Sequence, residues 1–296
     1  MGRIPSRPLD MTRSQLSLFD LAPGKVLLDR YLIDSPLREN GMSAAFRVTD
    51  QAEEAERELQ ACPASLFESK HQADAFGETL RSWSELDDAA FARVRNVDVL
   101  EDGAVIVVSD FPTGRALRDE IEAGARYDAQ AVVDLGAALL DGLVSAHAKG
   151  LFHGDIKPAT IFVGGDGPML VDGGVTPGLW AAKHLGTRTA LIGTPYYAPI
   201  EQFGGDAPDE RSDLYNLATV MYELLTGVMP WKGRSFIEVF QSKMQPEAPS
   251  MRSLAPDVEV DPDLERAIAK ALRGKRQERH ASAEEFRGAL AALTLA

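Results

Sequence analysis

The most informative part of this chain is residues 151–163, which read LFHGDIKPATIFV. Two opposite charges, Asp155 and Lys157, stand two positions apart between apolar runs. The closing run, 161–163, has the length and composition of a short buried strand. A second short strand is predicted at 169–171, and the sequence DGG follows at 172–174. Charged side chains therefore stand beside two predicted strands that are close in sequence.

The chain before this stretch is rich in strand patterns. Strands are predicted at 31–33 and 44–48, around a turn at 39–41, and at 94–97 and 104–108, around a turn at 101–103. Residues 72–86 are predicted to form a helix, because large apolar side chains recur there at helical spacing: Phe76, Leu80, Trp83 and Leu86.

The chain after Gly114 is mainly helical. Residues 128–148 carry an apolar stripe, and further helices are predicted at 212–226, 235–244, 262–272 and 282–294. Ser282 and Glu285 match a capping box, and Pro262 suits the first turn of its helix.

These patterns predict an α+β fold with two lobes. We assign residues 1–23 to an N-terminal extension and 24–296 to one domain, with a small strand-rich N-lobe at 24–111 and a larger helical C-lobe at 112–296. The extension carries Leu16, Leu18 and Phe19, which either pack on the N-lobe or serve a partner.

Composition narrows the classes of function. The chain has 31 basic and 45 acidic residues and a formal net charge of −14, which argues against non-specific binding to nucleic acid or to an anionic membrane surface. The one cysteine, Cys62, excludes an intrachain disulfide, so a reducing, cytoplasmic compartment is expected. No run of about 18 to 20 apolar residues predicts a membrane-spanning segment in this chain.

Five segments, taken in order, resemble the motifs of protein kinases. Residues 151–163 resemble the catalytic loop, His-Arg-Asp-Leu-Lys-Pro-x-Asn, and DGG stands where the family has Asp-Phe-Gly. Residues 193–201, GTPYYAPIE, resemble Gly-Thr-x-x-Tyr-Met-Ala-Pro-Glu, and 211–217, RSDLYNL, resemble the start of a long buried helix. Arg279 stands where the family keeps an arginine that pairs with the Glu201 position. The resemblance covers about residues 24 to 295 and is closest to bacterial Ser/Thr kinases.

This resemblance implies a bilobal kinase fold and, in an active member, transfer of the ATP γ-phosphate to protein hydroxyls with magnesium as cofactor. Asp155 would orient the substrate hydroxyl, Lys157 would steady the phosphate, and Thr194 would hydrogen-bond this pair. Asp172 would bind the metal, since magnesium prefers carboxylate oxygen. The positions expected to contact the nucleotide are Gly41, Gln60, Ser109, Asp110 and Thr160. The resemblance gives structural roles to Asp213 and to the Glu201–Arg279 pair.

The N-lobe departs from the family at its nucleotide contacts. Arg38, Asn40 and Ser43 stand at the three positions of the glycine-rich loop, where glycine lets backbone amides approach phosphate, and Gly41 fits a hairpin turn. Neutral Gln60 replaces the strand lysine. Lys70, the only lysine between Lys25 and Lys149, is predicted to be exposed before the helix, and Glu78 would lack its lysine partner.

The C-lobe departs less. Thr160 replaces the metal-binding asparagine, Gly173 replaces the phenylalanine of Asp-Phe-Gly, and Gly154 replaces the arginine that senses a phosphorylated activation loop. Thr187 and Thr189 would be the phosphorylation sites of that loop.

Because the losses concentrate on nucleotide contacts, the sequence favours a pseudokinase that acts through protein–protein contacts. The main alternative is an active atypical Ser/Thr kinase that uses Asp155, Lys157 and Asp172, with Lys70 or another cation replacing the missing lysine. A small-molecule phosphotransferase is suggested only by HGD at 153–155. A lysine amine near the expected phosphate positions would favour the active kinase, whereas an Arg38 or Met42 side chain filling the nucleotide pocket would favour the pseudokinase.

Overall fold

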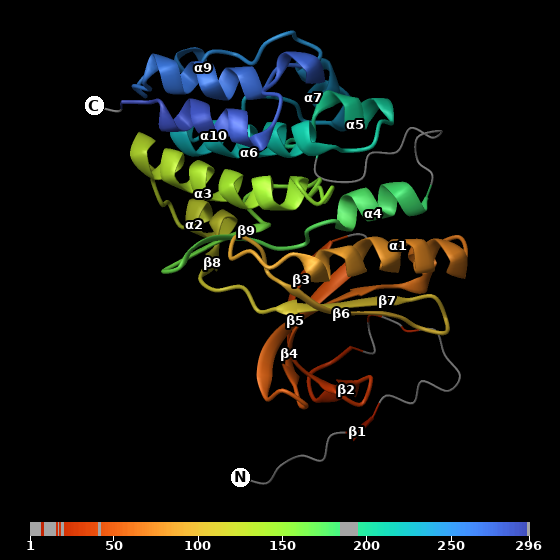
Figure 1. The fold of residues 1–296 in the computed structure, drawn as a ribbon. Helices are drawn as coiled ribbons and strands as arrows, with labels where there is room; N and C mark the ends of the chain where they lie inside the picture. The colour runs from red at the N-terminus through yellow and green to blue at the C-terminus, as the bar shows by residue number, and fades with distance from the viewer. Residues whose placement is uncertain are drawn as a thin grey trace. The chain divides into compact units, whose positions relative to one another are not determined.

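A computed structural model describes residues 7–8, 16, 18, 21–40, 43–183 and 195–294 (Figure 1). The chain forms two compact units, one from Met1–Asp87 and Ala92–Pro112 and the other from Asp88–Phe91 and Thr113–Ala296. The segment Asp88–Phe91 groups with the second unit because Leu170 donates its N–H to the Ala90 carbonyl (2.7 Å).

The first unit is built on one sheet. Its described strands follow the order β1-β2-β3-β4-β5-β7-β6, and every pair of neighbours is antiparallel except β1 with β2. The strands are β1 (Arg7–Pro8), β2 (Lys25–Leu27), β3 (Tyr31–Asn40), β4 (Ser43–Asp50), β5 (Ala55–Cys62), β6 (Val94–Val99) and β7 (Val105–Asp110).

The predicted hairpin of the first unit is confirmed. β3 and β4 pair from Tyr31 opposite Asp50 to Asn40 opposite Ser43, so residues 39 and 40, predicted to lie in the turn, belong to β3 instead. Residues 41–42 lie outside the described residues. β5 lies between β4 and β7, with Gln60 opposite Ala45 and Val107. Side chains alternate along a strand, so Glu58 and Gln60 share one face of this sheet.

Helix α1 (Lys70–Ser82) packs on the sheet. It begins where the Ser69 hydroxyl accepts the Gln72 N–H, and it ends earlier than the predicted 72–86 because Trp83–Glu85 form a 3₁₀ turn, η3. Another 3₁₀ turn, η2 (Ala64–Leu66), precedes it. A Cβ added to Gly77 would lie 2.6 Å from Val99 Cγ2, so a larger residue at 77 would separate the helix from β6.

The described residues of the N-terminal extension belong to the first unit. Leu16 and Leu21 are buried in the same apolar cluster as Leu27 and Ile33, and β1 adds a short parallel strand beside β2. The Leu16 N–H also donates to the Asp102 carboxylate (2.5 Å). At these positions the extension packs on the N-lobe, one of the two possibilities that the sequence left open.

The second unit is mainly helical. Its short sheet has the order β10-β9-β8 among the described residues. The elements are β8 (Arg115–Ala116), α2 (Leu117–Glu122), α3 (Ala129–His147), β9 (Ile161–Gly164), β10 (Gly167–Leu170), α4 (Val175–Ala182), α5 (Ile200–Gly204), α6 (Glu210–Thr226), α7 (Phe236–Lys243), α8 (Met251–Leu254), α9 (Pro262–Ala271), the 3₁₀ turn η5 (Arg276–Glu278) and α10 (Ala283–Ala291).

Helices α3 and α6 form the centre of this unit. Gly136 of α3 lies so close to Met221 of α6 that an added Cβ would be 2.8 Å from its sulfur. Among the described helices, α3 alone has the length and hydropathy of a membrane span, but 56% of that stretch is already buried inside the protein. This is weak support for a span, since a buried core helix has the same length and composition.

The helix ends agree with the local sequence. Pro262 lies in the first turn of α9, and the Ser282 hydroxyl accepts the Glu285 N–H, as predicted. The Glu285 carboxylate accepts the N–H of Ala281 (2.7 Å), one residue before the expected donor, so the second bond of the capping box is shifted.

Candidate functional site

The loop at residues 151–160 is organised by a carboxylate from the first turn of α6. Asp213 is fully buried and accepts the N–H groups of His153 (2.9 Å) and Gly154 (2.7 Å). His147 Nε2 lies 2.9 Å from the same carboxylate. Hydrogen bonds to a buried charged acceptor are among the stronger ones, so Asp213 fixes the backbone of this loop. The structural role predicted for Asp213 agrees with this geometry.

His153 connects the loop to the strand end that leads to Asp172. Its Nε2 lies 2.8 Å from the Val171 carbonyl, and its Nδ1 accepts the Asp155 N–H (3.3 Å). A ring nitrogen that accepts carries no proton, so the proton lies on Nε2 and is donated to Val171. Both nitrogens of this fully buried ring are therefore used to hold the backbone.

Asp155 and Lys157 are brought together by the loop. Lys157 Nζ lies 2.5 Å from Asp155 Oδ2, and both side chains are about one-fifth exposed, at 21% and 17%. Both side chains are accessible to a substrate, and their opposite charges compensate each other.

Thr160 has turned inward. Its hydroxyl oxygen accepts the Lys157 N–H (3.1 Å) and lies 3.1 Å from the carbonyls of Asp155 and Lys157, and the residue is 3% exposed. Thr160, at the position that holds an asparagine in the related family, thus stabilises the loop by hydrogen bonds within it.

The segment after Asp172 forms a helix that the sequence did not predict. Asp172 has a left-handed backbone (φ +64°), and Gly174 (φ +78°) precedes α4, which is largely buried. Gly154 also has a positive φ of +79°, and a Cβ there would lie 2.6 Å from Pro177 Cδ of α4. Helix α4 therefore packs on the loop in the space that a side chain at 154 would need.

In the first unit, the neutral side chain of Gln60 occupies the position of the expected lysine. Gln60 Nε2 donates to the Ser43 hydroxyl (3.1 Å), and both residues are buried, at 6% and 2% exposed. Two of the substituted positions thus bond to each other.

A second pair lies on the same face of the sheet. Arg38 donates to both carboxylate oxygens of Glu58, at 2.7 and 2.5 Å, and the Glu58 side chain is 3% exposed. This fork arrangement neutralises the buried carboxylate. Sequence reasoning missed Glu58, although its place two residues before Gln60 puts it on the same face as Gln60.

The lysine and glutamate expected around helix α1 do not meet each other. Lys70 Nζ donates to the Leu100 carbonyl (3.2 Å) and lies 3.6 Å from Asp74, with its side chain 53% exposed. Glu78 pairs with Arg81 on the same helix and is 73% exposed. The predicted exposure of Lys70 is confirmed, but Lys70 is the first residue of α1 and does not precede the helix. Glu78 has an arginine partner in place of the lysine.

Of the remaining positions that the sequence singled out, Ser109 and Asp110 are described by the structure and five others are not. Asp110 accepts two hydrogen bonds from Arg95 (2.8 and 2.7 Å) and forms an ion pair with Arg57 (3.0 Å), and Ser109 lies opposite Glu58 in the ladder. Gly41, Met42, Thr187, Thr189 and Thr194 lie outside the described residues.

The Glu201–Arg279 pair is present. Arg279 donates to both oxygens of Glu201 at 2.7 Å, and its side chain is fully buried. Burial opposes ionisation of Glu201, but the bonds from Arg279 lower the pKa of this carboxyl below its usual value.

The described residues do not fit ATP and magnesium in the manner of the related family. The side chain at position 60 is neutral, and Arg38 is already bound to Glu58, so neither position offers a free cation for the phosphates. Asp172 remains the one position of the expected metal site whose residue type fits, since Thr160 is engaged in its loop.

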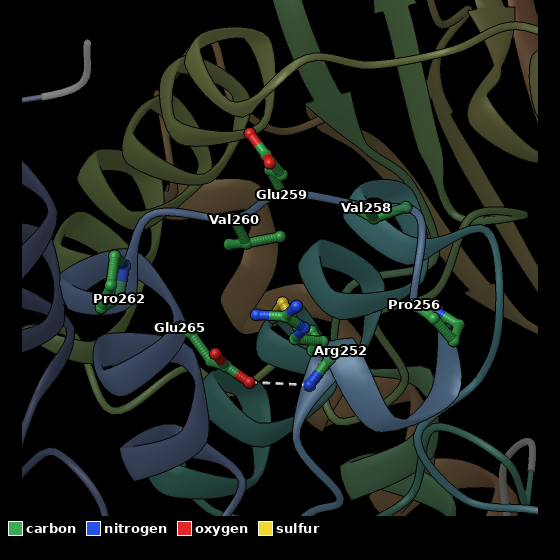
Figure 2. A pocket seen from close by; sticks show the side chains of 8 residues that line it. Arg252, Pro256, Val258, Glu259, Val260, Pro262 and Glu265 are labelled. Carbon is green, nitrogen blue, oxygen red and sulfur yellow. Dashed lines mark hydrogen bonds between the residues drawn. The ribbon is translucent and has the colours of Figure 1, made fainter.

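A pocket of about 420 Å³ lies elsewhere in the second unit (Figure 2). Arg252, Glu259 and Glu265 contribute its polar groups, and Glu265 accepts the Met251 N–H (2.7 Å). No residue of the 151–160 loop lines it, so it is separate from the catalytic motifs.

Comparison with known proteins identifies the family. The family described as "Protein kinase domain" matches residues 89–288, more than half of the chain. The chain therefore belongs to the protein kinase family.

The curated relatives are bacterial Ser/Thr kinases. The chain is 27% identical to the serine/threonine-protein kinase pkn3 of Myxococcus xanthus, over 91% of this chain and 51% of pkn3. It is 28% identical to PknB of Mycobacterium leprae, over 89% of this chain and 43% of that protein, and 29% identical to PknL of Mycobacterium tuberculosis, over 87% and 64%. The chain thus spans about half the length of these relatives.

A solved structure confirms the fold. The crystal structure of the Mycobacterium tuberculosis PknI kinase domain matches with a TM-score of 0.69 at 20% identity, covering 90% of this chain and 96% of that one. The predicted α+β protein-kinase fold, with a β-rich N-lobe and a helical C-lobe, is confirmed.

Proposed function

We propose that this chain is a pseudokinase, a signalling module of the protein kinase fold that binds protein partners and binds ATP weakly or not at all. One observation carries the proposal: the side chains at two of the three glycine-loop positions, Arg38 and Ser43, are bonded to Glu58 and Gln60 of β5. The N-lobe face that would meet the nucleotide is occupied by its own polar pairs.

Electrostatics support this reading. Phosphoryl transfer needs cations and backbone amides placed against the phosphates. Gln60 offers no charge, and the charge of Arg38 is compensated by Glu58 at 2.5 Å. A nucleotide that drew Arg38 away would leave the Glu58 carboxylate buried and unpaired, which costs several kcal/mol.

An active atypical Ser/Thr kinase is the second candidate. The contact of Asp155 with Lys157 favours it, because this pair has the arrangement that the catalytic loop of an active kinase needs. In that case ATP and magnesium would be the cofactors and protein hydroxyls the acceptors. The first unit contains only Lys25 and Lys70, and Lys70 is bound to Leu100, so the missing lysine has no evident replacement there.

The test is transfer of label from γ-labelled ATP, with magnesium and then manganese, comparing the chain with its Asp155→Asn variant. We expect no transfer above the variant. A combined variant, Arg38→Gly with Ser43→Gly, Glu58→Ala and Gln60→Lys, is expected to gain nucleotide affinity, measured by calorimetry. Transfer that Asp155→Asn abolishes would establish the active kinase instead.

Two further points belong to this proposal. The proposal includes a cytoplasmic location, which the single, fully buried cysteine Cys62 supports. The acidic net charge of −14 argues against nucleic acid as a partner. Cell fractionation and a filter-binding assay with mixed DNA and RNA would test them, and retention of nucleic acid at moderate salt would contradict the second.

A further inference from the structure

The pocket shown in Figure 2 carries its own set of charged side chains. Helix α8, the segment 256–260 and the first turn of α9 line it, and its volume of about 420 Å³ lies within the range of about 300–1,000 Å³ that is typical of small-molecule sites. Apolar side chains form much of the lining, which also holds three charged ones: Arg252, Glu259 and Glu265. A cavity of this size with a few polar groups is suited to a small ligand.

The walls of this pocket are held in place by the second unit. Met251 is 1% exposed, and its N–H donates to Glu265 Oε1 (2.7 Å). The Tyr222 hydroxyl of α6 donates to the Pro249 carbonyl (3.1 Å), in the segment that leads into α8. Pro262 fixes the backbone at the first turn of α9. The pocket is therefore formed without a ligand, which lowers the entropy lost on binding.

The charged side chains of the pocket do not neutralise one another. Arg252 and Glu259 are exposed, and their side chains form no ion pair or hydrogen bond within the described part of the chain. Glu265 accepts a backbone N–H and has no cationic partner among the same residues. Two carboxylates against one guanidinium leave the lining with one excess negative charge.

These charges lie at two sides of the pocket. Figure 2 shows Arg252 and Glu265 on one side and Glu259 on the other, with Val260 between them. A guanidinium matches a carboxylate through two parallel hydrogen bonds. The Glu265 carboxylate is oriented by the Met251 N–H and has a second oxygen that can accept from an ammonium group. The first side therefore suits a carboxylate and an ammonium on one carbon atom, and Val260 offers apolar surface between them and the second carboxylate.

We propose that this pocket binds a free basic α-amino acid, lysine or arginine. The α-carboxylate of the ligand meets Arg252, and its α-ammonium meets Glu265. The methylene chain lies along Val260, and the side-chain cation reaches Glu259. The ligand carries two positive charges and one negative charge, so each has an opposite charge in the pocket. The proposal does not depend on whether the chain binds ATP or transfers phosphate.

Isothermal titration calorimetry of the full chain with L-lysine and L-arginine tests the proposal. Three analogues of lysine each lack one charged group: Nα-acetyl-lysine has no α-ammonium, cadaverine has no carboxylate and norleucine has no side-chain cation. We expect each analogue to bind at least about tenfold more weakly than L-lysine, the effect of losing one hydrogen bond between charged groups. The analogues test the parent chain itself, so this result does not depend on how well any variant folds.

Variants of the pocket assign each contact. Glu265→Gln keeps an oxygen that accepts the Met251 N–H but removes the charge, and we expect it to weaken L-lysine binding at least about tenfold. Arg252→Met should make L-lysine and cadaverine bind alike, and Glu259→Gln should do the same for L-lysine and norleucine. Asp257→Asn is the matched control, because Asp257 is exposed in the same segment and does not line the pocket. It is expected to leave the affinity unchanged.

The proposal would be overturned if about 10 mM of either amino acid produced neither heat of binding nor a rise in the midpoint of thermal unfolding. Equal affinity of L-lysine for the chain and for Glu265→Gln would also refute it. So would cadaverine that binds as tightly as L-lysine, because a general attraction of cations to a chain of net charge −14 requires no pocket. Loss of affinity with each analogue, cancelled by the matching variant, would establish the site.

Discussion

Replacement of Gly154 by alanine tests how tightly α4 packs on the catalytic loop. Gly154 has φ +79°, and an added Cβ would lie 2.6 and 2.8 Å from Pro177 Cδ and Cγ. The left-handed backbone costs an alanine about 1–2 kcal/mol, and overpacking adds about 1–3 kcal/mol because a proline ring in a helix cannot swing away. We expect Gly154→Ala to lower the free energy of unfolding by about 2–5 kcal/mol.

Gly150→Ala is the matched control. Gly150 also has a positive φ (+70°), but nothing lies within 4 Å of the added Cβ, so only the backbone cost of about 1–2 kcal/mol applies. Urea unfolding followed by circular dichroism compares the two variants. A double-mutant cycle of Gly154→Ala with Pro177→Ala should show that the loss of the ring relieves the excess cost.

The emission of Trp180, which lies on α4 and is 3% exposed, reports the helix itself once the signal of Trp83 and Trp231 is subtracted with a Trp180→Phe variant. Gly154→Arg, which restores the residue of the family, is expected to displace α4 and shift this emission to the red. Equal costs for Gly154→Ala and Gly150→Ala, within about 0.5 kcal/mol, would refute the argument that α4 presses on the loop.

Three other substitutions test separate contacts. Arg279→Met removes both bonds of the fork to the buried Glu201 carboxylate but leaves Arg276 Nε 3.2 Å from it, so it should cost at most about 3–5 kcal/mol in urea unfolding. Because the bonds from Arg279 lower the pKa of Glu201, this loss of stability relative to the parent should be complete above about pH 4.5 and should shrink as the pH falls. Burial holds the pKa of Lys243 well below its usual value. Between that lowered pKa and about 10.5 the unfolded chain binds one more proton than the folded chain, so the free energy of unfolding rises by up to about 1.4 kcal/mol per pH unit. Lys243→Met should abolish this dependence on pH. An equal slope in both proteins in the pH range just below 10.5 would contradict it. Thr160→Val should cost about 1–3 kcal/mol in thermal unfolding, and an unchanged midpoint would show that its loop bonds are dispensable.

The helices of the second unit could be predicted because their signals are local. α3 and α6 repeat apolar residues at helical spacing, and Asp128 and Asp209 cap their first turns. The catalytic loop was predicted from its motif alone, whereas the contact of Asp155 with Lys157 became visible only in the structure.

Helix α4 could not be predicted, because its sequence, VTPGLWAA, contains proline and glycine and has little intrinsic helix propensity. It is helical because nearly all of its residues are buried, and burial is a property of the tertiary fold. The Arg38–Glu58 pair was also hidden. The β3–β4 register shifts between Pro36 and Arg38, and a shift of one residue changes which face a side chain occupies.

The two lobes carry different information about catalysis. The polar groups of His153 and Thr160 in the 151–160 loop, and of Asp213 on α6, all bind the backbone. A chain that had lost phosphoryl transfer would therefore still need them to fold. Their presence therefore says little about activity.

The N-lobe substitutions are more informative, because they occur in bonded pairs. Arg38→Gly alone would leave Glu58 as an unpaired buried carboxylate, and Gln60→Lys alone would bury an ammonium beside the Ser43 hydroxyl. Each single reversal toward the family's residue should therefore destabilise the N-lobe, and only joint reversals should be tolerated. The two pairs stabilise this face of the N-lobe without a nucleotide. The pseudokinase proposal therefore rests on these pairs, and not on the separate losses of the glycines and the lysine.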